Sequence, residues 1–315
     1  MSKSWRSALS IIERVHVEFR LDNNCSNDEM LRLATSQLQN INNLSICDGR
    51  KDISLNWDST GRLVASCSSK LKHFMFCRET VYAHTTANNA FDSLQNSTPL
   101  ESLTLENIIF EEIGCIERIL QNKTRLRKLN LEKLTIRDPA LHGDDAETHL
   151  GLLAQIGKLH TLRELHLTSY HNPIREFDTA ILLSGLKNLQ HLHICVHTEK
   201  VFLTISRYCP ALNLKYLRIE DYGSPDGTVR LNHVVLNYLQ SSKIHTLVLR
   251  SSFYDDADYA CSAGNIIRLC RPNTTLRRLV VGIATSNGAN ADDLIAFAAD
   301  ESKGCVKLIP LVVGY

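Results

Sequence analysis

Four side chains of types that bind metal ions fall within eight residues: His142, Asp144, Asp145 and His149. Their spacing matches no strong ligand motif, and Asp144 and Asp145 more simply favour the start of a helix. The chain also lacks a Gly-rich phosphate loop, a Gly-x-Ser-x-Gly nucleophile motif and a zinc motif. The sequence therefore predicts a protein that is not an enzyme and that uses no cofactor and no metal.

Ten cysteines are scattered along the chain without a Cys-x-x-Cys pair, and the first residues lack the apolar core of a signal peptide. Reduced thiols in the cytoplasm or nucleus are the favoured interpretation. Three of them, Cys47, Cys77 and Cys195, follow an apolar strand directly and are expected on its exposed face. We interpret them as structural, although a reactive thiol remains the alternative.

A third set of side chains could bind a protein. His166 and His193 occupy the same slot of two similar segments, and Tyr216 and Arg218 follow in the next. Arginine and tyrosine are common at protein-binding hot spots, and cationic groups recognise carboxylates and phosphates. We predict a docking face for an acidic or phosphorylated peptide, and the alternative is a merely solvated polar face. The full predicted set is Lys128, Arg163, His166, His191, His193, Lys215, Tyr216 and Arg218.

The element that must position these residues is a recurring triplet, Φ-x-x-Φ-x-Φ, in which Φ is Leu, Ile, Val or Phe. It occurs eleven times at intervals of about 29 residues, a period that indicates a solenoid. Its Φ-x-Φ half alternates as a strand with one buried face does. The triplets open at Ile12, Ile41, Leu71, Leu100, Leu126, Leu162, Leu189, Leu214, Ile244, Leu276 and Val306.

The segments between the triplets supply the crossovers that parallel strands require. Apolar residues recur at helical intervals in most of these segments. One segment, 52–65, instead alternates like two short strands around a turn, and we expect it to be extended. The expected helices lie in 28–38, 113–120, 176–187, 229–240 and 259–270. Further loops that could contribute to binding lie at 137–145, 221–227 and 251–256.

From residue 12 to about 311, the pattern resembles a leucine-rich-repeat protein. That resemblance implies an α/β solenoid of about eleven repeats, shaped as a horseshoe, with a parallel concave sheet and a mostly helical convex side. The common repeat has Asn or Cys three residues after its last Φ, whereas this chain has Ile108, Leu134, Tyr170, His197, Tyr222 and Ser252 there. Its irregular repeats are closer to those of F-box and ribonuclease-inhibitor-like proteins.

The N-terminal segment Ser2-Lys3-Ser4-Trp5-Arg6 resembles the tail of an F-box domain, which ends in a Cys/Ser-Lys-x-Trp-Arg signature. The rest of the box is absent. We therefore divide the chain into a cap or F-box remnant at 1–11 and a repeat domain at 12–315. Trp5 is either a remnant of adaptor binding or a cap over the first repeat.

Net charge is +1, which gives no bulk electrostatic reason to expect nucleic acid or membrane binding. The resemblance implies the substrate-recognition part of an F-box-type ubiquitin ligase, with an adaptor as a second partner if an F-box precedes Met1. The alternative is a stand-alone repeat scaffold or inhibitor with no link to a ligase.

Overall fold

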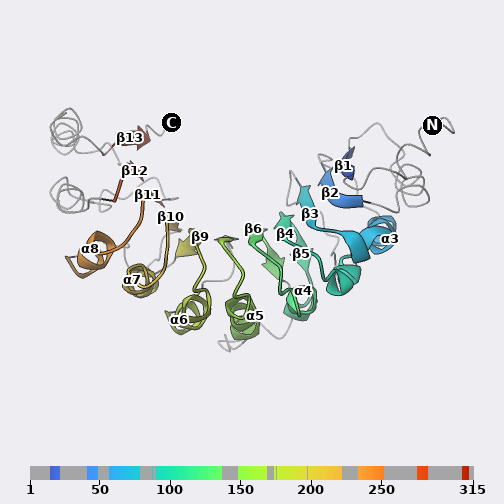
Figure 1. Cartoon of the computed structure of the whole chain (residues 1–315), viewed down its shortest axis with the longest axis horizontal. Coiled ribbons are helices and arrows are strands. Elements are labelled where there is room, and N and C mark those ends of the chain that lie inside the picture. Colours follow the sequence, from blue (N-terminus) through green and yellow to red (C-terminus); the bar gives the residue numbers. More distant parts are fainter. Residues whose placement is uncertain are drawn as a thin grey trace. The chain divides into compact units, whose positions relative to one another are not determined.

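The protein is described by a computed structural model, shown in Figure 1. Its described residues are 15–21, 41–48, 57–78, 87, 90–136, 148–168, 174, 176–196, 198–221, 233–251, 275–282 and 307–311. The chain divides into two compact units. Unit 1 comprises Met1–Leu162 with Thr168–Asn172, and unit 2 comprises Arg163–Leu167 with Pro173–Tyr315.

Unit 1 contains a parallel sheet in which strands follow one another in chain order. Its strands are β1 (Val15–Leu21), β2 (Ile41–Asp48), β3 (His73–Arg78), β4 (Ser102–Glu106) and β6 (Lys128–Glu132). A small parallel pair joins β5 (Ile109–Phe110) to β7 (Thr135–Ile136). The connections carry helices α3 (Trp57–Cys67), η1 (Ser68–Lys70), η2 (Asp92–Asn96), α4 (Ile113–Leu120) and α5 (Thr148–Gly157).

Unit 2 repeats this plan. Its strands are β8 (Glu164–Thr168), β9 (His191–Val196), β10 (Tyr216–Asp221), β11 (Thr246–Ser251), β12 (Arg278–Gly282) and β13 (Lys307–Leu311), all parallel to their neighbours. The connecting helices are α6 (Glu176–Gly185), α7 (Glu199–Tyr208) and α8 (His233–Gln240). In each unit the helices lie on one side of the strands and leave the other side open (Figure 1). Both units therefore have the strand–helix organisation of an α/β solenoid.

The triplets form the core between strands and helices. Leu103, Leu129, Leu165, Leu192 and Leu217 hold the same position in successive strands, and each is fully buried. Because alternate residues of a strand point to opposite faces, the residues directly before and after each of these leucines belong to the open face. Every triplet overlaps one of the strands, as the period predicts. No helix in the described residues is both long and apolar enough to cross a membrane.

The expectation of an extended segment at 52–65 is wrong for its second half, where α3 forms. Its buried residues Leu63, Val64 and Cys67 recur at helical intervals. Trp57, at its start, packs against Phe76 and Phe91 with ring centroids 5.4 and 5.8 Å apart. This tertiary packing of one apolar face overrides the alternating pattern that favoured strands.

The other expected helices fare differently. Helix α4 matches the expected 113–120, and α6 and α8 lie within 176–187 and 229–240. The expected helices at 28–38 and 259–270 lie outside the described residues. The three expected loops, at 137–145, 221–227 and 251–256, also lie outside the described residues, except for Asp221 and Ser251 at the ends of β10 and β11.

Side chains also tie successive repeats of unit 1 together. Asn107, in the left-handed conformation with φ 55°, donates through Nδ2 to the backbone carbonyl of Arg78. This bond links the residue after β4 to the end of β3. The Thr161 hydroxyl makes a similar link, because its Oγ1 donates to the backbone carbonyls of Thr124 and Leu126.

Candidate functional site

Five of the predicted binding residues lie together on the strands of unit 2. His166 is on β8, His191 and His193 are on β9, and Tyr216 and Arg218 are on β10. We call this set the histidine–tyrosine face. Strand alternation and the buried leucines between them assign all five to the open side of the sheet.

The remaining predicted residues lie elsewhere. Arg163 and Lys215 are exposed and come directly before β8 and β10, where their carbonyls accept hydrogen bonds that start the next strands. Lys128 is on β6 in unit 1. Trp5 lies outside the described residues, so its predicted role stays a prediction.

Parallel register brings the rings of the histidine–tyrosine face into contact. His166 is opposite His193, and their centroids are 5.4 Å apart in an edge-to-face arrangement. His191 is opposite Tyr216, and their rings stack at 5.9 Å with an interplanar angle of 18°. The shared slot of His166 and His193 in the sequence pattern thus correctly predicts that they lie side by side.

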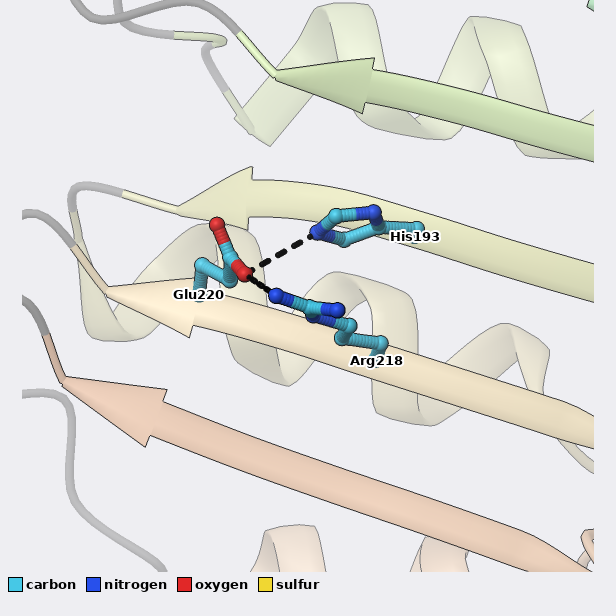
Figure 2. Close-up of polar contacts among 3 residues, drawn as sticks. All are labelled: His193, Arg218 and Glu220. Carbon is cyan, nitrogen blue, oxygen red and sulfur yellow. Dashed lines mark hydrogen bonds and ion pairs between the residues drawn. The ribbon is translucent and has the colours of Figure 1, made fainter. Parts of the chain in front are cut away.

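Glu220 is the counter-charge that the sequence interpretation missed. Figure 2 shows its carboxylate between His193 and Arg218. Glu220 Oε1 lies 3.3 Å from His193 Nε2 and accepts a hydrogen bond from the Arg218 guanidinium. The sequence could have indicated Glu220, because this residue continues the alternation of the open face one residue beyond the last apolar position of the triplet. The predicted set ended before that residue.

This arrangement shifts two pKa values. Burial acts to raise the pKa of Glu220, but the contacts with His193 and Arg218 outweigh it and lower that pKa to about 2. Burial acts to lower the pKa of Arg218, while Glu220 and Tyr216 hold it above the ordinary arginine value. Arg218 is therefore charged and already engaged at neutral pH.

Burial corrects two expectations. His193 is only 5% exposed, so its ring contacts its neighbours on the face and is not offered to a partner. Cys195, expected on the exposed face, is 2% exposed, whereas Cys47 and Cys77 are partly exposed. The accessible groups of the histidine–tyrosine face are His166, His191, Tyr216 and part of Arg218.

A separate hollow of about 340 Å³ lies in unit 1 beside the ends of α4 and α5. Lys123 lines it and is 1% exposed, and burial lowers the pKa of its amine to about 8. Its Nζ donates to the carbonyl of Gln95, 2.7 Å away, at the end of η2. Lys123 therefore serves as a buried link between repeats.

Within the described residues, no group of three or more His, Cys, Asp or Glu side chains is arranged to hold a metal ion. The histidine–tyrosine face instead offers one edge-to-face ring pair, one stacked ring pair and a shared carboxylate on an open sheet. Such a surface can bind by aromatic contact and by charge-assisted hydrogen bonds.

No protein-family model matches the chain, and no curated protein matches its sequence. Among solved structures, the chain is similar to an internalin from Listeria monocytogenes, with 12% sequence identity and a TM-score of 0.39. The alignment covers 98% of this chain and 89% of that chain.

Proposed function

We propose that the chain is a non-enzymatic protein-recognition scaffold of the leucine-rich-repeat type. In this proposal about eleven repeats form a horseshoe, and the histidine–tyrosine face is part of its concave binding surface. The strand–helix units that follow one another in chain order support it, because they leave one side of each sheet without a covering helix. Repeat proteins commonly bind through such a surface.

The observation that carries the proposal is the stacked pair of His191 and Tyr216. Both rings are partly exposed, and the two residues are register partners on adjacent strands. Rigid aromatic side chains lose little conformational entropy on binding, which makes them effective anchors. Arg218, which donates to Glu220, adds a directed donor two residues along β10 from Tyr216.

We expect the partner to present an acidic or phosphorylated segment. Glu220 already balances part of the charge of Arg218, so the exposed cations before the strands matter more. Arg163 and Lys215 both lie at the start of strands that carry this face. A carboxylate or phosphate would meet these cations while the rest of the segment packs on the rings.

An array of synthetic peptides tests this proposal, with each sequence made in phosphoserine, glutamate and alanine versions. We expect phosphoserine and glutamate versions to bind the wild-type chain better than alanine versions. His191→Ala with Tyr216→Ala should abolish binding, and Lys215→Glu should weaken it most for the phosphorylated peptides. Arg218 is left unchanged because its replacement would also break the contact with Glu220.

His73→Ala is the matched control, because His73 is an exposed histidine at the corresponding row of the open face in unit 1. It should leave peptide binding unchanged. Binding that ignores peptide charge, or that survives the loss of both His191 and Tyr216, would refute the docking face.

The finer role that we propose is substrate recognition for an F-box-type ubiquitin ligase, in the cytoplasm or nucleus. Its support is the resemblance of Ser2-Lys3-Ser4-Trp5-Arg6 to an F-box tail beside the repeats. The alternative is a stand-alone scaffold or inhibitor. An in-frame upstream exon encoding a Leu-Pro-containing apolar helical segment would favour the ligase, and a verified start at Met1 would favour the scaffold.

A further inference from the structure

A second chemical cluster lies on the open face of unit 1, apart from the proposed docking face. Cys47 on β2 and Cys77 on β3 are register partners on adjacent parallel strands. Both alternate with buried core residues, namely Ile46 and Phe76, so both belong to the open side. Both are partly exposed thiols that form no disulfide.

A third sulfur accompanies the two thiols. Met75 lies two residues before Cys77 on β3, on the same face, and is partly exposed. Its register partner on β2 is Ser45, and its unbranched thioether side chain is flexible. Cys47, Met75 and Cys77 therefore place three soft donor atoms on one small patch, which we call the sulfur cluster.

The strand spacing suits a bridging ion. Register partners in a sheet are separated by about 4.8 Å. Two metal–sulfur bonds of about 2.3 Å span up to about 4.6 Å between the sulfurs. Two thiolates held one strand apart therefore suit an ion seated between them.

We propose that the sulfur cluster is a binding site for Cu(I), with Cys47 and Cys77 as thiolate ligands and Met75 as a thioether ligand. Thiolates and thioethers are the donors that select this soft ion. Zinc prefers four donors from cysteine, histidine and carboxylates. The described part of the chain contains no group of three such residues fit to hold a metal, so the thioether decides for Cu(I).

Binding exchanges protons for the ion without a change of oxidation state. Each thiol loses one proton, two Cu–S bonds form to thiolates, and the thioether donates a lone pair. The Cys77 thiol donates to Glu106 Oε2, 3.2 Å away, so this carboxylate lies ready to accept a departing proton.

The test is an anaerobic competition between the full chain and the chelator bicinchoninate for Cu(I). Cys47→Ser and Cys77→Ser should each remove one whole equivalent of bound Cu(I), because one thiolate alone does not hold the bridging ion. Met75→Leu should keep that equivalent but release it at a lower chelator concentration. Cys195→Ser is the matched control, since Cys195 is also the last residue but one of its strand, but its register partner on β10 is Glu220 and not a cysteine.

Equal losses from Cys47→Ser, Cys77→Ser and Cys195→Ser would overturn the proposal, because they would indicate independent cysteines. The proposal would also be overturned if the Cys47→Ser and Cys77→Ser variants both bound as much Cu(I) as the wild-type chain. If a variant fails to fold, alkylation of the wild-type protein by iodoacetamide decides. One equivalent of Cu(I) should protect the Cys47 and Cys77 peptides together, and unprotected peptides would contradict the site.

Discussion

At the scale of single residues, Glu220 has the most consequential contacts. Its carboxylate is shared by His193 and Arg218, which belong to two adjacent strands (Figure 2). Removal of such an acceptor leaves two polar partners in a poorly solvated place, which costs more than the bond itself contributes. Loss of the Glu220 charge would therefore change both the packing and the charge of the histidine–tyrosine face.

We expect Glu220→Gln to lower the free energy of unfolding at neutral pH and to make that free energy depend less on pH in the acidic range. The folded pKa of about 2 is below the ordinary value of 4.5, so the carboxylate stabilises the fold above pH 4.5. That contribution, roughly 1–3 kcal/mol, is lost as the pH falls from about 4.5 toward 2. Urea unfolding at several pH values measures it.

The control for this prediction is Glu132→Gln, which changes the carboxylate at the corresponding position of β6 in unit 1. It should leave the slope of stability against pH close to that of the wild type. A Glu220→Gln variant with an unchanged slope between pH 4.5 and 3 would show that the shared carboxylate does not stabilise the fold.

Asn107 yields a second prediction at this scale. Asn107→Gly preserves its left-handed backbone but removes the amide that donates to Arg78, so we expect a loss of about 1–2 kcal/mol in the free energy of unfolding. Asn122→Gly is the control, because Asn122 is also left-handed, with φ 61°, but is exposed. Chemical denaturation compares the two, and equal losses would contradict a role for the Asn107 side chain.

The sequence predicts residue positions better than residue exposure. The pattern places His166 beside His193 because both hold one slot of the repeat, and parallel register carries this into space. It does not predict that His193 is buried, since burial depends on neighbours such as Arg218 and Glu220 on another strand. It also omits Glu220, because the motif ends at the last apolar residue.

At the scale of elements, two helical glycines offer a matched comparison. At Gly151 in α5, an added methyl would meet only the flexible carboxylate end of Glu117. At Gly61 in α3, it would lie 3.3 Å from the backbone of Ala90, which cannot turn aside. Alanine in a helix is favoured over glycine by about 0.5–1 kcal/mol when space permits.

We therefore expect Gly151→Ala to raise the free energy of unfolding by about 0.5–1 kcal/mol, and Gly61→Ala to gain less or to destabilise the chain. Thermal and chemical unfolding of the two variants measure the difference. A larger gain at Gly61 than at Gly151 would contradict the close packing of α3 on Ala90.

Helix α3 also shows why the connecting elements are harder to predict than the strands. The strands are specified by apolar residues at fixed spacing, and each triplet overlaps one. The segment that forms α3 contains polar residues and a glycine with weak local preference, so its helix depends on Trp57 packing against Phe76 and Phe91. These partners are distant in sequence, and no local pattern encodes them.

At the scale of the whole molecule, the two units carry different chemistry on the same kind of sheet. Unit 1 presents the sulfur cluster, and unit 2 presents the histidine–tyrosine face. A net charge of +1 gives the chain no bulk attraction for a partner, so recognition must come from local groups. The repeat supplies equivalent positions, and the residues that fill them determine what each unit can bind.

The most direct test of the docking face is photo-crosslinking in cells from two single positions of unit 2. Benzoylphenylalanine replaces either Tyr216 on the open side or Phe177, which is 67% exposed on α6 at the helical side. Both changes exchange one aromatic side chain for another. We expect a covalent adduct with a discrete partner protein from position 216 and none from position 177. Equal adducts from both positions, or an adduct from position 177 alone, would contradict it.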